Sequence, residues 1–140
     1  MRAGEVQMQT RRAAPLQKLV LTALTCLALT QFASPASAAD ATAGADSFDA
    51  NCSDCHSLAK PLKNKKGPSL VGVLGRPSAS VPGFDYSDAM KAANLKWTAD
   101  KLDAYIANPK AVVPEDKMKF KGLPDAKERG DLIEFLSQQK

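Results

Sequence analysis

The sequence is poor in histidine and cysteine, with one His and three Cys in 140 residues. A site built from several histidines is therefore impossible, and so is a four-ligand Cys/His zinc cage away from the single histidine. Charged residues (24%) and hydrophobic residues (44%) occur in ordinary amounts, which argues against a fully disordered chain. The length suits a single domain, since domains commonly have roughly 100–200 residues.

The apolar run near the N-terminus, from Leu19 to Thr30, is too short to cross a bilayer, which takes about 20 residues. It follows four basic residues and precedes the small residues Ala36-Ser37-Ala38. A basic region, a short apolar run and a small-residue cleavage site, in that order, are typical of a secretory signal peptide. We therefore predict a signal peptide over residues 1–38, cleavage near Ala38, and a mature domain over residues 39–140 in the periplasm.

Two variants of this signal carry less weight. Arg11-Arg12 suggests export by the twin-arginine route, but the flanking residues do not support it. Cys26 is a poor lipidation site because it lies in the middle of the apolar run after Thr25, so an apolar filler is the simpler interpretation.

Cleavage of the signal peptide also changes the charge. It removes four basic residues and one acidic residue, which lowers the formal net charge from +4 to +1. Nucleic-acid binding thereby loses its main support, and we expect no nucleic-acid partner. The remaining charge is unevenly spread, because residues 39–54 carry only acids and residues 60–66 carry only lysines.

One motif in the predicted mature chain carries chemistry, Cys52-Ser53-Asp54-Cys55-His56. Structural zinc needs four ligands, and no distant Cys or His completes the set. A thiol redox motif is expected between a strand and a helix, but no strand-like alternation precedes Cys52. C-x-x-C-H is the signature of covalent c-type haem attachment, which is the interpretation we favour. An ordinary disulfide between Cys52 and Cys55 remains the alternative.

If His56 binds the haem iron on one side, the group on the other side decides the function. No second histidine exists, so the candidates are the thioethers of Met90 and Met118. Met90 lies in a short helical stretch, where methionine is usually core filler. Met118 follows Pro109 and Pro114, which predict an irregular loop able to bring a side chain inward. Met118 is therefore the better sixth ligand.

The sequence from residue 44 to 140 resembles the class I cytochromes c, the mitochondrial-like and bacterial soluble carriers with one haem. The motifs that carry the resemblance extend well beyond the haem-attachment motif and cover nearly the whole predicted mature domain. They include Gly67-Pro68-Ser69-Leu70, Leu74-Gly75-Arg76, Gly83 to Ala89, Trp97, Tyr105 with Asn108-Pro109-Lys110, Lys117-Met118 and Arg129 to Ile133.

The resemblance implies roles for individual residues. His56 and Met118 would be the axial ligands of one haem c, and Cys52 and Cys55 its thioether anchors. The Pro68 carbonyl would accept a hydrogen bond from the His56 ring. Tyr105 would lie near the Met118 sulfur. The haem propionates would be held by Arg76, Tyr86 and Trp97. The alternative for Arg76 is a solvated surface charge. The alternative for Tyr86, Trp97 and Tyr105 is plain aromatic core, and in either case these three rings should be buried.

Two residues depart from the family pattern. Met90 occupies a position that is often Asn, so we expect a drier interior there. Asp116 stands where Thr is common, and a carboxylate beside a haem propionate would be repelled. We expect Asp116 to face solvent or to pair with a nearby lysine.

The expected fold is small, all-α and single-domain, with long loops around the haem. A first helix is predicted from Asp40 to Asn51, with Gly44 allowing close approach to the last helix. A further helix is expected after Thr98, ending before Pro109. The last helix should begin at Asp125, with Glu128 completing a capping-box-like start. No segment shows convincing strand alternation.

The expected function is one-electron transport between respiratory or photosynthetic complexes, with no enzymatic reaction. The donor would be a cytochrome bc-type complex and the acceptor a terminal oxidase or a photosynthetic reaction centre. A monomer without stable membrane insertion should dock on their acidic faces through lysines near the haem edge. These are Lys63, Lys65, Lys66, Lys110, Lys117, Lys119 and Lys121. A small-ligand-binding haem enzyme and a dedicated dehydrogenase subunit are the two alternatives.

Overall fold

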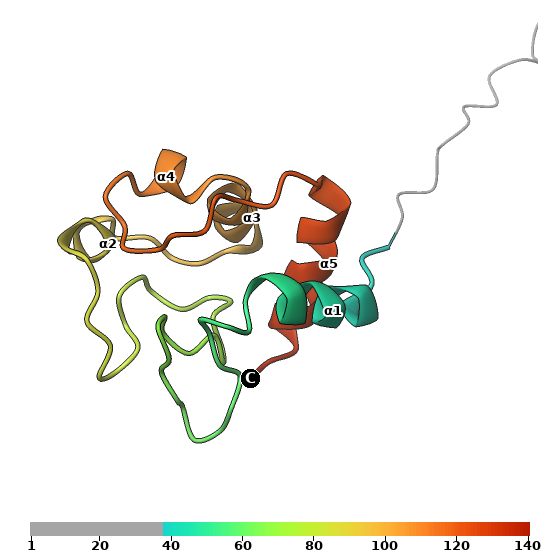
Figure 1. Ribbon diagram of the computed structural model, residues 1–140, viewed down its shortest axis with the longest axis horizontal. Coiled ribbons are helices and arrows are strands. Elements are labelled where there is room, and N and C mark those ends of the chain that lie inside the picture. Colours follow the sequence, from blue (N-terminus) through green and yellow to red (C-terminus); the bar gives the residue numbers. More distant parts are fainter. Residues whose placement is uncertain (1–37) are drawn as a thin grey trace, which may run out of the picture. The chain divides into compact units, whose positions relative to one another are not determined.

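The computed structural model describes residues 38–140, and the chain there is helical, without a strand. The predicted export segment, including Arg11-Arg12 and Cys26, lies outside the described residues except for Ala38. The helices are α1 (Ala41–Asn51), α2 (Asp88–Ala92), α3 (Ala99–Ala107), α4 (Pro109–Val112) and α5 (Ala126–Ser137) (Figure 1). The expected all-α fold is confirmed, with one isolated bridge between Pro77 and Lys96 as the only extended pairing described.

Each predicted helix start has a side-chain cap. Asp40 caps α1 by accepting from Thr42 N–H, so this helix begins one residue later than predicted. Thr98 caps α3 and Asp125 caps α5, as expected. Each cap supplies an acceptor to the first turn of its helix, where the backbone N–H groups have no partner within the helix.

The segment from Pro109 to Val112 forms the short helix α4, so the prediction of an irregular loop is wrong for these four residues. Asn108 caps this helix through its side chain, and Pro109 stands at the first helical position. Proline suits that position because its fixed φ is already helical and its missing N–H is not needed there. The irregular segment that carries Met118 therefore begins only after α4.

The packing of α1 against α5 is the most extensive contact between helices among the described residues, and the two cross in Figure 1. A β-carbon added to Gly44 would overlap the carbonyl oxygen of Asp131 and lie 2.8 Å from Cβ of Phe135. The rings of Phe48 and Phe135 meet beside this point, with centroids 5.8 Å apart. Glycine at position 44 is therefore required for the helices to approach this closely, as the sequence predicted.

Polar contacts hold the same two helices in register. Asp131 is buried and accepts from Asp40 N–H and from the Lys127 ammonium. Glu128 accepts from Ser47 on α1, at 2.8 Å, rather than reaching back to the cap of its own helix. The predicted capping-box-like start is thus present in one direction only, through Glu128 N–H and Asp125.

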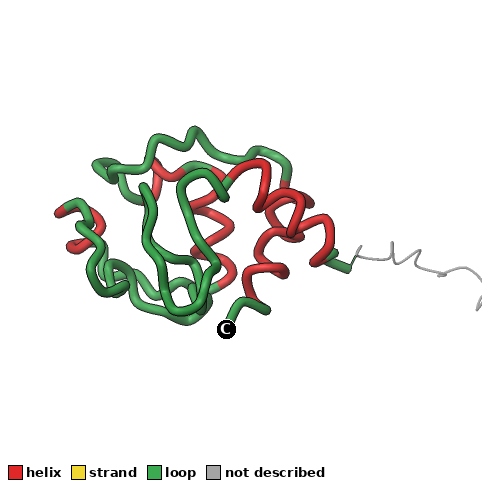
Figure 2. The backbone as a smooth tube through the Cα atoms, turned by 60° about the horizontal axis from the view of Figure 1, so that its bottom comes forward, coloured by secondary structure: helices red, strands yellow, loops and turns green. Residues whose placement is uncertain are grey.

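A long irregular segment, residues 52–87, joins α1 to α2, and loops form much of the described chain (Figure 2). A second irregular segment, residues 113–125, joins α4 to α5. It returns to α3 at Leu123, whose N–H donates to the Ile106 carbonyl at 2.9 Å. The core that these segments cover is built from buried residues of α1, α2, α3, α5 and both loops. No helix within residues 38–140 is long and apolar enough to span a membrane.

Replacing Gly44 with Ala tests the helix crossing. We expect the free energy of unfolding to fall by about 1–3 kcal/mol, because the added methyl group must push α1 away from the Asp131 backbone. Denaturant unfolding of the haem-loaded protein measures the change.

Gly130→Ala is the matched control, since a β-carbon there meets nothing within 4 Å. Alanine favours the helix over glycine by roughly 0.5–1 kcal/mol, so this variant should be more stable than the wild type. Equal effects of the two substitutions would show that the crossing does not depend on the close approach at Gly44.

Candidate haem site

The C-x-x-C-H motif forms a tight turn at the end of α1. Cys52 is the C-cap of the helix, and its carbonyl accepts from both Cys55 N–H (3.1 Å) and His56 N–H (2.9 Å). The two thiols and the imidazole are therefore displayed from one turn of backbone. Both cysteines are free, Cys52 half-buried and Cys55 exposed, so the structure does not contain the alternative disulfide.

The acidity of Cys52 argues against a thiol redox motif. Burial, with a smaller contribution from Cys55, raises the pKa of Cys52 to about 11. Reactive redox thiols have lowered pKa values because the thiolate is the attacking species. Cys52 is instead kept as a neutral thiol, next to a helix C-terminus where an anion is disfavoured.

The His56 ring is oriented by a backbone carbonyl from the loop. Its Nδ1 lies 2.8 Å from the Pro68 oxygen. A carbonyl can only accept, so Nδ1 carries the proton and Nε2 keeps its lone pair for a metal. Burial also lowers the pKa of His56, which favours the neutral, ligating form.

The backbone passes directly against the face of this ring. A β-carbon at Gly67 would overlap Cε1 and lie 2.8 Å from Nδ1. The Gly67 N–H is in turn held by the Cys55 carbonyl at 2.8 Å. Loop 57–68 thus closes on the attachment motif and restricts the orientation of the imidazole.

These features fit a covalent c-type haem and not zinc. Two thiols on one turn suit two thioether bonds, and the adjacent neutral imidazole offers Nε2 to iron. Within residues 38–140 no three His, Cys, Asp or Glu side chains gather closely enough to hold a metal ion by themselves. When bound, the haem supplies an iron that changes between Fe(III) and Fe(II).

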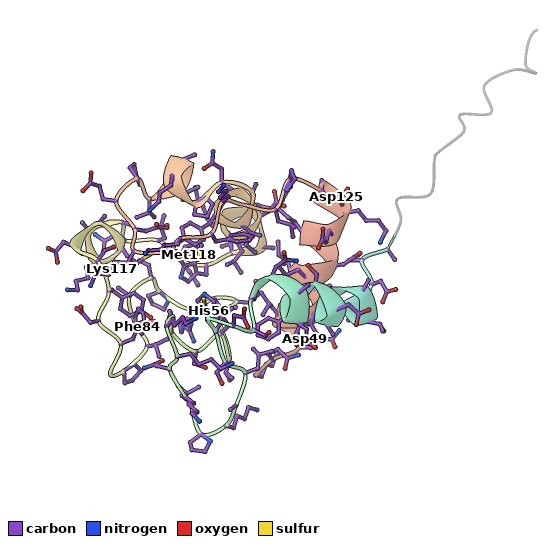
Figure 3. All side chains as sticks on the ribbon, in the orientation of Figure 1. Asp49, His56, Phe84, Lys117, Met118 and Asp125 are labelled. Carbon is purple, nitrogen blue, oxygen red and sulfur yellow. The ribbon has the colours of Figure 1, made fainter. Side chains whose placement is uncertain are left out.

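The two methionine candidates lie in different surroundings. Met90 is buried in the core on α2. Met118 is half-buried, in the segment between α4 and α5, and packs against the same core. Figure 3 labels Met118 together with His56, both within the area that the loops enclose in that view.

The other predicted site residues have defined positions. Trp97 and Tyr105 are buried with ring centroids 5.0 Å apart. Arg76 is not a solvated charge, since its guanidinium donates to the carbonyls of Ser69 (2.9 Å) and Val71 (2.6 Å). Burial lowers the pKa of Arg76, although arginine remains protonated in proteins.

Tyr86 is only half-buried, so the expectation of burial is wrong for this aromatic residue. Its ring meets Phe84 edge-on, with centroids 4.8 Å apart, and its hydroxyl accepts from Val81 N–H at 3.3 Å. These contacts belong to the loop before α2, where the ring packs against the core without being enclosed by it.

Asp116 is buried and paired with Lys110, so the second of its two expected environments is found. The sequence interpretation missed its other contact, a hydrogen bond from the Tyr105 hydroxyl at 2.5 Å. Burial and the Asp116 carboxylate both raise the pKa of Tyr105, which therefore stays protonated and donates. One signal in the sequence could have indicated this hydrogen bond: a tyrosine expected to be buried is followed closely by an acidic residue in a lysine-rich segment.

Comparison with known proteins agrees with this site. No protein-family model matches the chain. It is 47% identical over 97 residues to the cytochrome c of Stellaria longipes, covering 69% of this chain and 90% of that one. It is 46% identical over 96 residues to the cytochrome c2 of Rhodoplanes tepidamans, covering 69% and 89%. For the cytochrome c2 of Blastochloris viridis the figures are 43% over 104 residues, 74% and 81%.

The helical fold and the C-x-x-C-H turn define the class of small all-α proteins with a c-type haem. At these identities and coverages, the chain belongs to the cytochrome c family.

Gly67→Ala tests the cradle of the imidazole. The added methyl group must displace the His56 ring, so we expect a changed visible spectrum of the haem-loaded protein and a stability loss of about 1–3 kcal/mol. Gly44→Ala serves as the comparison, because it should lower stability without a direct contact to the imidazole and so change the spectrum less. An unchanged spectrum in Gly67→Ala would contradict the close fit at the ring.

Proposed function

We propose that this protein is an exported, soluble one-electron carrier in which Cys52 and Cys55 hold the haem through thioethers and His56 and Met118 are its axial ligands. Membership of the cytochrome c family supports electron transport by a c-type haem. The observation that carries the proposal is the His56 ring, with its proton on the side of Pro68 and its lone pair free.

Met118 is supported as the sixth ligand by its place in the chain. It lies in an irregular segment that brings it against the core, whereas Met90 is already packed within α2. A soft thioether favours Fe(II) over Fe(III) and therefore raises the reduction potential. With both axial positions filled, no site is left for a substrate, which favours a carrier over an enzyme.

The proposal places the mature domain, residues 39–140, in the periplasm after removal of residues 1–38. Support comes from the basic, apolar and small-residue order of the N-terminal sequence. Cleavage before Ala39 would leave intact the Asp40 cap of α1 and its hydrogen bond to Asp131.

The partners proposed are acidic faces of membrane redox complexes: a cytochrome bc-type donor, and a terminal oxidase or photosynthetic reaction centre as acceptor. Of the lysines expected to dock, Lys110 pairs with Asp116 and Lys117 with Asp85. The charge free for steering is therefore carried by the others, Lys63, Lys65, Lys66, Lys119 and Lys121. All are exposed, as docking requires.

The visible spectrum of the oxidised and reduced protein, with and without CO, tests the axial ligands. The wild type should be low-spin, show a weak far-red sulfur-to-iron band when oxidised, and ignore CO. Met118→Ala should lose the band and bind CO when reduced, because it opens one coordination position. Met90→Leu is the control and should behave as the wild type, since it conserves volume in the core.

A high-spin wild type that binds CO readily would contradict the carrier function and favour the small-ligand-binding alternative. Loss of the far-red band in Met90→Leu, with the band retained in Met118→Ala, would show that Met90 and not Met118 is the sixth ligand.

Charge reversal at Lys119 tests the steering surface. Oxidation of the reduced Lys119→Glu variant by the anionic probe hexacyanoferrate(III) should be several-fold slower at low salt, because one charge carries only part of the ~10–10³-fold gain known for steering. The difference should shrink at high salt, where charges are screened beyond about 3 Å at 1 M. Lys140→Glu, with the same charge change after α5, should have little effect. Equal rates for Lys119→Glu and the wild type at low salt would contradict steering.

A further inference from the structure

Asp116 is a buried carboxylate two residues before Met118. Its side chain is only 2% exposed, and both of its carboxylate oxygens have hydrogen-bond partners. The Tyr105 hydroxyl donates to Oδ2, and the Lys110 ammonium donates to Oδ1 and, at 2.6 Å, to the backbone oxygen of the same residue. A charge this deeply buried is tolerated only when it is paired in this way.

The three contacts join segments that are separate in the fold. Tyr105 belongs to α3, Lys110 to α4, and Asp116 to the irregular segment between α4 and α5. Lys110 remains half-exposed, so its ammonium keeps much of its hydration while it satisfies the carboxylate. The carboxylate therefore ties the backbone that carries Met118 to two helices at once.

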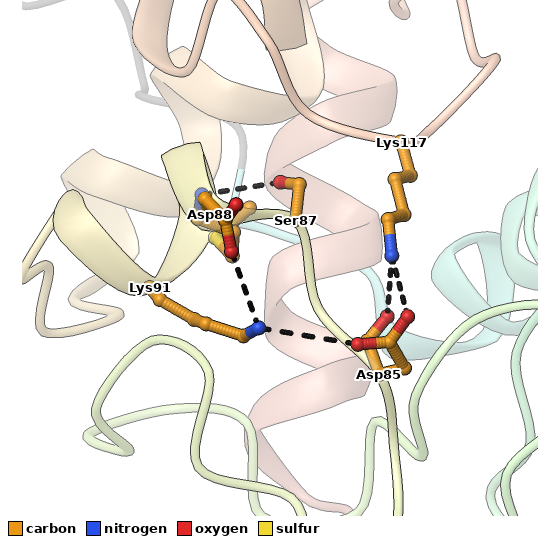
Figure 4. Close-up of polar contacts among 6 residues, drawn as sticks. Asp85, Ser87, Asp88, Lys91 and Lys117 are labelled. Carbon is orange, nitrogen blue, oxygen red and sulfur yellow. Dashed lines mark hydrogen bonds and ion pairs between the residues drawn. The ribbon is translucent and has the colours of Figure 1, made fainter.

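A second set of contacts holds the same segment from outside. The Lys117 ammonium lies 2.7 Å from Asp85 Oδ2, and Lys91 on α2 approaches the other oxygen at 3.9 Å (Figure 4). The Asp85 side chain is 83% exposed, so water and salt screen these pairs. The inner and outer contacts on this segment thus differ sharply in strength.

We propose that Asp116 is a positioning residue. Through Tyr105 and Lys110 it holds the irregular segment that carries Met118 (residues 113–125, the Met118 segment) closed against α3 and α4, and so determines how readily Met118 leaves the iron. This inference rests on the proposed role of Met118 as axial ligand. The exposed Asp85 contacts contribute little to that closure.

Imidazole, added to the oxidised haem-loaded protein, is the probe, because it competes with Met118 for the iron. An amide has one oxygen, so in Asp116→Asn either Tyr105 or Lys110 loses its acceptor on this side chain. The loss of one hydrogen bond to a charged group weakens the hold on Met118, so imidazole should bind roughly 10- to 100-fold more tightly in this variant, which corresponds to ~1.4–2.8 kcal/mol. The far-red band should weaken in parallel.

Asp131→Asn is the matched control. Asp131 is also a buried carboxylate, with a side chain 5% exposed, paired with a half-exposed lysine, but it lies between α1 and α5. This variant should unfold more easily while its imidazole affinity stays at the wild-type value. A purely structural effect of Asp116 would instead make the two variants alike.

Two further variants separate the inner contacts from the outer ones. Asp85→Asn should change imidazole affinity little, and only at low salt, whereas the effect of Asp116→Asn should persist at high salt. In the double variant Asp116→Asn/Lys110→Gln the second change should add little, because the two residues act as a pair.

Equal imidazole affinity in the wild type and Asp116→Asn would overturn the inference, and so would an equal gain in Asp131→Asn. Ready binding of CO by the reduced wild type is a different result, since it would remove Met118 as a firm ligand and contradict the proposed function itself.

Discussion

The close contact of α1 with α5 at Gly44 is the constraint on which the rest of the described structure depends. Because α1 ends at Asn51 and the attachment motif begins at the next residue, the crossing determines where Cys52, Cys55 and His56 can lie. α5 is in turn tied to α3, since Arg129 pairs with Asp103 at 2.7 Å. The helix pair therefore connects the motif to the helix that carries Tyr105.

The candidate site is assembled from two kinds of contact. The turn at Cys52 is local, and hydrogen bonds within it present the thiols and the imidazole together. The orientation of the imidazole is not local, because Pro68 and Gly67 come from the far end of the following loop. Haem attachment would thus depend on the spacing within the motif, and ligation by His56 on how the following loop returns to it.

Electrostatic contacts around the Met118 segment are arranged by depth. The inner carboxylate, Asp116, is enclosed and fully paired, while Asp85 binds Lys117 at the surface. Lys110 of α4 and Lys117 of this segment are consequently neutralised in place, and Lys119 and Lys121 remain for the proposed partner. In this lysine-rich region, paired lysines hold the segment against the interior, while unpaired lysines leave positive charge at the surface.

The sequence alone determined the family, the attachment motif and most of the helices, because these depend on spacing and on local capping. Asp40, Thr98 and Asp125 cap helices that the pattern of apolar residues already indicated. The same local rules also favour α4, since Asn108-Pro109 is a strong helix start, but two prolines in the segment led to the prediction of a loop.

Only the tertiary structure decided which polar groups meet. The partners of Asp116 and Asp85 come from other segments, and Asp85 binds a lysine 32 residues away. The tertiary structure also leaves the Tyr86 ring half-buried, edge-on against Phe84. Spacing along the chain specifies what a residue can do within one turn of backbone. Which distant donor satisfies a buried acceptor depends on how the loops close, and that is a property of the packed molecule.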